Sequence, residues 1–246
     1  MNKDLKKKIL KLKLAAALGI TLATNNPIAK AEESRIEFNV ETWGNPEFGE
    51  DLYHTLEELP QGLNNFFKEN DTEVVLLEGE SSADYVWKEL FGESYPSSIT
   101  GFTATDDYSS TVYVEASTHN GYYEKYEESS KGLTPKEFNS RITKNTLLHE
   151  LGHAVDENLN CSLSGNDNFY EIFIEEAEHF KDTISFKIDS YQIYANISTA
   201  SEYFASSFAA WKTYPDDLKK NCPKTYQYIE DNIKAIIEKY NHTKAR

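Results

Sequence analysis

Two histidines four positions apart, with a glutamate directly after the first, are the residues of this chain best suited to chemistry. They are His149, Glu150 and His153, within the segment HELGH. On an α-helix, residues four apart lie on the same face, so two such imidazoles can bind one Zn²⁺ at about 2.0–2.1 Å each. Glu150 projects about 100° round the helix from His149, where it can reach a metal-bound water without binding the ion. The motif predicts one zinc ion per chain and Glu150 as general base.

A third protein ligand must come from elsewhere, because catalytic zinc sites have three and leave a fourth position open for water. The extended motif with a third histidine six residues after His153 does not apply, since that position is Leu159. A glutamate about twenty residues after the second histidine is another known arrangement. The candidates near that distance are Glu171, Glu175 and Glu176. Their segment is acidic along most of its polar face, which is also typical of a solvated helix surface.

Glu202, further along the chain, is a second type of candidate. It lies in the segment STASEYFASSF at residues 198–208. Thr199 and Glu202 also have the spacing of a capping box, in which the glutamate serves the start of its own helix. From spacing alone the capping role is favoured over the ligand role.

In these segments the chain resembles a known family, the catalytic domain of the anthrax lethal factor and the small secreted Pro-Pro endopeptidases related to it. That family has HExGHAVD followed by E-[FY]-F-A, and this chain has HELGHAVD at 149–156 and EYFA at 202–205, at a slightly longer spacing. Residues 221–229, NCPKTYQYI, are also similar to the terminal helix of the lethal factor. The resemblance covers residues 140–240 and implies that Glu202 is the third zinc ligand.

The resemblance also implies a tyrosine shortly before that glutamate, whose phenol stabilises the oxyanion of the tetrahedral intermediate. The expected position holds Ala195, so we infer a one-residue insertion and choose Tyr194 as the catalytic tyrosine, with Tyr191 as the alternative. A second departure is Ser206, where the lethal factor has a further glutamate. This serine leaves open which groups support the metal-binding histidines.

The elements that position these residues are strands in the first half of the chain and helices in the second. The box Thr134-Pro135-Lys136-Glu137 predicts the start of the helix that carries HELGH. Strands are predicted at 34–40 and 73–77, with a hairpin at 99–105 and 111–117. Further helices are predicted at 50–68 (broken near Pro60), 85–91, 169–180, 199–211 and 223–240. This order indicates an α+β fold. The resemblance specifies a zincin-like metalloprotease domain, with a small mixed or antiparallel sheet, an active-site helix and C-terminal helices.

The strand at 111–115 is the candidate edge along which an extended peptide substrate would bind by strand addition. The polar segment 117–131 reads as a long loop beside it, with Tyr122, Tyr123 and Tyr126 as candidate walls of the substrate subsites. An ordinary surface loop is the alternative.

Composition limits the possible partners. The chain has 246 residues and a formal charge of −16, which argues against binding to nucleic acids or anionic membranes, since both need a basic face. Hydrophobic residues make up 39% of the chain, enough for a sizeable core.

The two cysteines, Cys161 and Cys222, exclude a disulfide-rich scaffold and a four-cysteine zinc site. They form one disulfide or are two buried thiols.

The first 31 residues have the pattern of a secretory signal peptide. Six lysines lie within residues 1–13, an apolar stretch covers 14–23, and Ala29-Lys30-Ala31 is a small-x-small cleavage site. The apolar stretch is too short to span a bilayer as a helix. We therefore expect a secreted monomer without a membrane anchor, formed by a single catalytic domain at 32–246.

These features together predict a secreted zinc metalloendopeptidase that hydrolyses extracellular proteins by zinc-activated water with Glu150 as base. In the Pro-Pro branch of the family it would cleave between two prolines of a proline-rich substrate. Two other hypotheses are a toxin-type protease acting on a host signalling protein and a non-enzymatic binding module that contains zinc.

Overall fold

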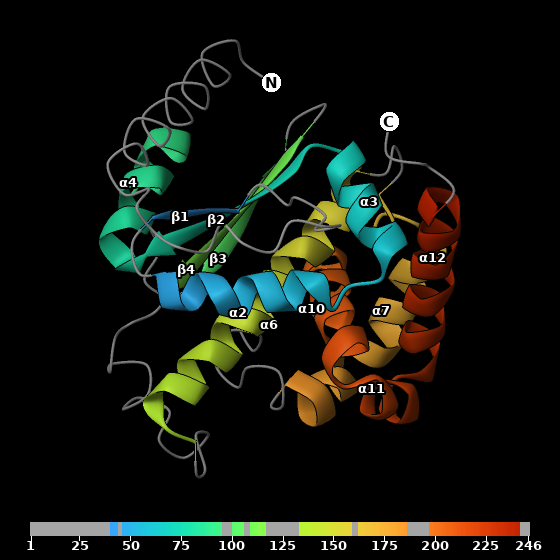
Figure 1. Ribbon diagram of the computed structural model, residues 1–246. Helices are drawn as coiled ribbons and strands as arrows, with labels where there is room; N and C mark the ends of the chain where they lie inside the picture. The colour runs from blue at the N-terminus through green and yellow to red at the C-terminus, as the bar shows by residue number, and fades with distance from the viewer. Residues whose placement is uncertain are drawn as a thin grey trace.

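The structure is a computed structural model that describes residues 40–43, 46–94, 100–105, 109–116, 133–158, 162–185 and 197–241. The predicted signal peptide, most of the predicted strand at 34–40 and the predicted loop at 117–131 lie outside these residues. The described elements are β1 (Val40–Trp43), α2 (Pro46–Glu57), α3 (Gln61–Glu69), β2 (Thr72–Glu78), α4 (Gly79–Phe91), β3 (Gly101–Thr105), β4 (Ser110–Ala116), α6 (Pro135–Asn158), α7 (Asp167–Phe180), the π-helix η1 (Lys181–Ser185), α10 (Ala200–Thr213), α11 (Pro215–Asn221) and α12 (Pro223–Asn241) (Figure 1).

The strands form one mixed sheet in the order β1-β2-β4-β3. Strands β1, β2 and β4 are parallel, and β3 pairs with β4 as the antiparallel hairpin that the sequence predicts. The prediction that residues 111–115 form an edge is wrong, because β4 has β2 on one side and its hairpin partner on the other. The edge on this side of the sheet is β3.

Both faces of the sheet are buried, and the side chains of β2 alternate between them. Val74 and Leu76 belong to the main core, while Val75 and Leu77 pack on the opposite face against α4, where they meet Val86. On the main-core side, α6 packs against β3 and β4. This alternation is the period of two expected for a strand covered on both sides by helices.

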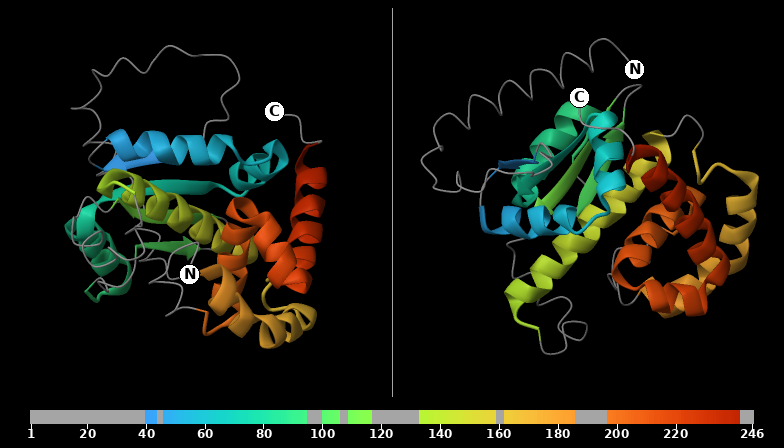
Figure 2. Two further views of the ribbon diagram at one scale, coloured as in Figure 1. Left: turned by 90° about the horizontal axis from the view of Figure 1, so that it is seen from below. Right: turned by 45° about the vertical axis from the view of Figure 1, so that its right-hand side comes forward.

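The C-terminal helices pack beside the sheet-bearing part of the molecule, and Figure 2 shows them as a group next to α6. Helix α10 packs along α6, and α12 reaches back to α3. Phe169 of α7 packs against Tyr203 and Phe204 of α10, with ring centroids 5.8 Å and 5.5 Å apart. These aromatic contacts hold α10, and with it the segment containing Glu202, in a fixed place beside α6.

The start of α6 follows its predicted capping box. The backbone N–H of Glu137 donates to Thr134 Oγ1 (3.3 Å), and the N–H of Thr134 donates to Glu137 Oε2 (2.7 Å). The helix then runs for 24 residues and buries Leu147, Leu148 and Leu151. The motif HELGH therefore lies within the helix that starts at the capping box, as predicted, and next to buried leucines.

The predicted α+β class is confirmed, with a small mixed sheet, a long central helix and helices at the C-terminal end. The predicted break near Pro60 separates α2 from α3. Helix α4 begins six residues before its predicted start, and α11 was not predicted, although Pro215 at its first turn is a start signal. Among the described helices, none is long and apolar enough to cross a membrane.

Gly152 lets α6 and α10 approach closely. A Cβ at this position would lie 2.7 Å from Ala205 Cα and 3.0 Å from Ala205 O, and these backbone atoms cannot move without shifting α10. We expect Gly152→Ala to lower the free energy of unfolding by about 1–3 kcal/mol, measured by urea denaturation. The matched control is Gly165→Ala, whose Cβ would meet only Ser162 atoms at 3.4 Å or more. Equal free energies of unfolding for the two variants would contradict the close approach of α6 and α10 at Gly152.

Candidate metal centre

The structure brings three side chains with metal-binding atoms together at the contact between α6 and α10. The Nε2 atoms of His149 and His153 are 3.2 Å apart. Oε2 of Glu202 lies 3.2 Å from Nε2 of His149 and 3.6 Å from Nε2 of His153. Within the described residues, this is the group of three or more His, Cys, Asp or Glu side chains that could hold a metal ion.

The spacing of these three atoms fits a zinc ion. Four ligands at about 2.1 Å from a tetrahedral centre are separated from one another by about 3.4 Å, and the three observed separations bracket that value. Oε2 of Glu202 is buried and accepts no hydrogen bond of good geometry within the described residues. Two imidazoles and one carboxylate are also a donor set used by catalytic zinc. The residues therefore fit the metal.

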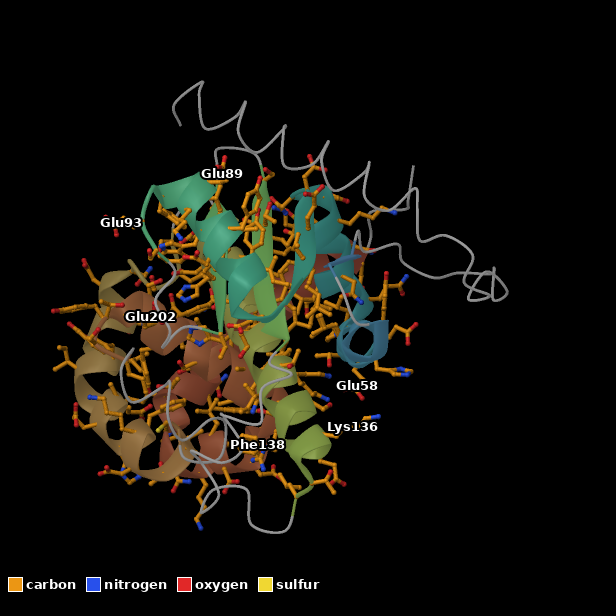
Figure 3. All side chains as sticks on the ribbon, turned by 90° about the vertical axis from the view of Figure 1, so that its left-hand side faces the viewer. Glu58, Glu89, Glu93, Lys136, Phe138 and Glu202 are labelled. Atoms are coloured by element: carbon orange, nitrogen blue, oxygen red, sulfur yellow. The ribbon has the colours of Figure 1, made fainter. Side chains whose placement is uncertain are left out.

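The first turn of α10 explains how Glu202 reaches the histidines. Thr199 is the N-cap, and its Oγ1 accepts a hydrogen bond from the backbone N–H of Glu202 (3.2 Å). The cap thus uses the main chain of Glu202 and leaves its carboxylate free to point at α6. Figure 3 shows Glu202 at the boundary between the sheet-bearing part and the C-terminal helices. In a complete capping box the carboxylate of Glu202 would also accept from the N–H of Thr199. The described hydrogen bonds include only the half that uses the N–H of Glu202, so the carboxylate is available to the histidines.

Glu150 is not one of the three candidate ligands, and its carboxylate contacts the edge strand β3. Its side chain is buried (6% exposed), and Thr103 Oγ1 donates to Oε2 at 2.8 Å. Burial raises the pKa of Glu150, while the nearby charges of His149 and His153 and the Thr103 hydroxyl oppose that rise. A buried carboxylate held by one neutral donor has the properties of a proton acceptor. Sequence patterns gave no signal for Thr103, which is 47 positions away from Glu150.

The charges of the site are strongly coupled in the metal-free protein. Burial by itself would lower the pKa of His153, but the carboxylate of Glu202, 3.6 Å from its Nε2, and the charge of Glu150 raise that pKa to about 9. Burial would raise the pKa of Glu202, yet its interactions with the two histidines hold that pKa well below the usual range. Glu202 is therefore ionised at any ordinary pH, as a metal ligand has to be.

Two serines of α10 contact the far ring nitrogens of the histidines. Ser206 Oγ lies 3.2 Å from Nδ1 of His149, and Ser201 Oγ lies 3.3 Å from Nδ1 of His153. The sequence left the role of Ser206 open, and the structure places its hydroxyl against a candidate ligand. Ser201 was missed, although its position directly before Glu202 in the first turn of α10 is a signal that could have found it.

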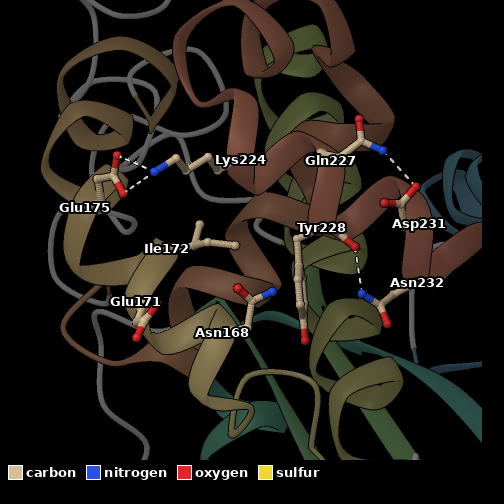
Figure 4. Close-up of a pocket in the computed structure, with 9 residues that line it drawn as sticks. All are labelled: Asn168, Glu171, Ile172, Glu175, Lys224, Gln227, Tyr228, Asp231 and Asn232. Carbon is tan, nitrogen blue, oxygen red and sulfur yellow. Dashed lines mark hydrogen bonds and ion pairs between the residues drawn. The ribbon is translucent and has the colours of Figure 1, made fainter.

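The other glutamates considered as ligands lie between α7 and α12. Glu175 pairs with Lys224, and Glu176 accepts hydrogen bonds from the N–H and the hydroxyl of Thr225 at the start of α12. Glu171 and Glu175 line a separate pocket of about 570 Å³ between these helices (Figure 4). In the described structure Glu175 and Glu176 connect α7 to α12, and the metal-capable group includes none of the three glutamates.

The two candidate catalytic tyrosines, Tyr191 and Tyr194, and Cys161 lie outside the described residues. The same holds for the candidate subsite tyrosines Tyr122, Tyr123 and Tyr126. Cys222 is described, as a buried free thiol. Burial raises its pKa to about 12, so this thiol is unreactive at neutral pH.

Comparison with known proteins identifies the family to which this chain belongs. The family model described as "Anthrax toxin lethal factor, N- and C-terminal domain" matches residues 45–232, which include every residue of the candidate site. The lethal factor of Bacillus anthracis is 33% identical over an alignment of 103 residues, which covers 37% of this chain and 11% of that protein. The chain thus matches only a small part of the length of this curated relative. Among solved structures, the Pro-Pro endopeptidase PPEP-2 from Paenibacillus alvei is similar with a TM-score of 0.49 and 20% identity, covering 78% of this chain and 96% of that one.

Proposed function

The chain belongs to the family of the anthrax toxin lethal factor, N- and C-terminal domain, and from this premise we propose that it is a zinc-dependent metalloendopeptidase. The observation that carries the proposal is the convergence of His149, His153 and Glu202, with separations of 3.2 Å to 3.6 Å, beside a buried Glu150 outside the ligand group. Three ligands and an adjacent carboxylate are the arrangement used to activate water for hydrolysis.

In this proposal each residue has a separate task. His149, His153 and Glu202 hold the metal, and bound zinc would lower the pKa of a water molecule and polarise the scissile carbonyl. Glu150 would accept a proton from the attacking water and donate it to the leaving amine. Thr103 keeps the carboxylate of Glu150 oriented through its 2.8 Å hydrogen bond. The family resemblance supports Tyr194 as donor to the oxyanion.

We further propose that the substrate is a peptide segment of an extracellular protein, bound in extended form along β3. This strand is an edge of the sheet, and its Thr103 contacts Glu150, so a peptide added there would pass beside the proposed base. Cleavage between two prolines is the proposed preference, on the resemblance of HELGHAVD and EYFA. Prolines lack the N–H needed for strand pairing, so such a segment would form few hydrogen bonds with β3. The leader-like pattern of residues 1–31 supports export.

Incubation of the purified protein with a combinatorial peptide library, with and without phenanthroline, tests this function. We expect cleavage that the chelator abolishes and added Zn²⁺ restores, because the proposed mechanism needs the ion to activate water. Mass spectrometry of the products would show whether Pro-Pro bonds are enriched. A protein that binds zinc but shows no chelator-sensitive cleavage would be a binding module, and the proposal would fail. Cleavage confined to a sequence without Pro-Pro would favour the toxin-type alternative.

A further inference from the structure

The two candidate ligand histidines are supported differently at Nδ1. The hydroxyl of Ser206 contacts His149, and within the described chain no hydrogen bond connects Ser206 to an acidic group. The hydroxyl of Ser201 contacts His153 and also lies 3.3 Å from Oδ2 of Asp156. Asp156 is 1% exposed. His153 is thus connected through one hydroxyl to a buried carboxylate.

The chemistry of these groups fixes the direction of the hydrogen bonds. A neutral imidazole that offers the lone pair of Nε2 to a metal carries its proton on Nδ1. In His153 this Nδ1–H donates to Ser201 Oγ, and the single proton of the hydroxyl then donates to Asp156, which as a carboxylate can only accept. In this series of hydrogen bonds each donor therefore has an acceptor, from His153 through Ser201 to Asp156.

Asp156 is itself held in place at its other oxygen. Oδ1 accepts a hydrogen bond from the backbone N–H of Ser164 (2.7 Å) and one from the hydroxyl of Ser162 (3.0 Å). Both donors belong to the segment that precedes α7, whereas Asp156 is on α6. The carboxylate is therefore held between α6 and the segment before α7. It is a fixed acceptor for the series of hydrogen bonds that begins at His153.

We propose that Ser201, acting with Asp156, is a positioning residue of the metal site, an inference that rests on the proposed zinc function. Ser201 fixes the ring of His153 and places its proton on Nδ1, so that Nε2 faces the metal. Because Ser201 directly precedes Glu202, one turn of α10 supplies one ligand and orients another. Groups that hydrogen-bond a ligand histidine in this way typically contribute about 10- to 100-fold to metal affinity.

The test is the zinc affinity of Ser201→Ala, measured by competition with a chromogenic chelator in the absence of substrate. We expect the Kd for Zn²⁺ to rise about 10-fold, and Ser201→Thr, which retains a hydroxyl, to restore most of the affinity. The matched control is Ser207→Ala. Ser207 is on the same helix, and its buried hydroxyl forms no hydrogen bond with either histidine in the described structure. This variant should leave the Kd unchanged. Thermal unfolding of the metal-free proteins checks that each variant folds.

A double variant separates positioning from a general loss of packing. If Ser201 acts through Asp156, adding Asp156→Asn to Ser201→Ala should weaken zinc binding by less than the sum of the two single effects. A wild-type Kd in Ser201→Ala, an equal loss in Ser207→Ala, or no rescue by threonine would overturn the proposal. A different result would contradict the proposed function, namely tight zinc binding by the wild-type protein without peptide cleavage. The Kd values of the serine variants could still be compared in that case.

Discussion

The variant Glu150→Ala should lose peptide hydrolysis while it keeps its zinc. A general base contributes about 10²- to 10⁴-fold to the rate of a reaction, and kcat/KM should fall by that amount. Glu150 is outside the group of three candidate ligand atoms, so its removal leaves the metal-binding atoms in place. Cleavage of a peptide from the library and the zinc content of the dialysed protein, measured by atomic absorption, are the two readouts.

The matched control for this variant is Glu157→Ala. Glu157 is on the same helix, but it is exposed, and it belongs to neither the ligand group nor the contact with β3. It should hydrolyse the peptide at the wild-type rate. Retained cleavage in Glu150→Ala would falsify the assignment of the base, and loss of zinc in that variant would show that Glu150 binds the ion.

The variant Glu202→Ala should lose zinc and, with it, activity. Removal of one of three protein ligands should weaken binding by more than the roughly 10- to 100-fold that follows the loss of a supporting hydrogen bond. Helix α10 should still form, because Thr199 caps it through the backbone N–H of residue 202, which alanine retains. Circular dichroism of the variant should therefore match the wild-type protein, while chelator competition shows the lost affinity.

Glu171→Ala is the control that separates the two ligand hypotheses left open by the sequence. Glu171 is exposed on α7 and lines the pocket between α7 and α12. We expect its loss to leave zinc affinity unchanged. The opposite pattern, with zinc retained in Glu202→Ala and lost in Glu171→Ala, would contradict the site and the mechanism built on it.

Local signals in the sequence predicted most of the elements. The capping box at Thr134 and Glu137 forms as expected, since its partners are three residues apart and need no tertiary contact. The strand at 73–77 and the hairpin were found for the same reason. The order of the strands was not predicted, and β4 was wrongly placed at an edge, because strand order depends on pairing between segments distant in the chain.

The site divides in the same way. The shared face of His149 and His153 follows from local sequence alone, because residues four apart on a helix lie on the same side whatever surrounds the helix. The sequence proposed Glu202 as a ligand only through the family resemblance, since its spacing alone favours a capping role. The fold was needed to show that the carboxylate of Glu202 lies near both histidines. It also revealed the contact of Thr103 with Glu150 and the connection of His153 to Asp156 through Ser201. These contacts join residues more than forty positions apart, and the close packing of α6 with α10 and β3 brings them together.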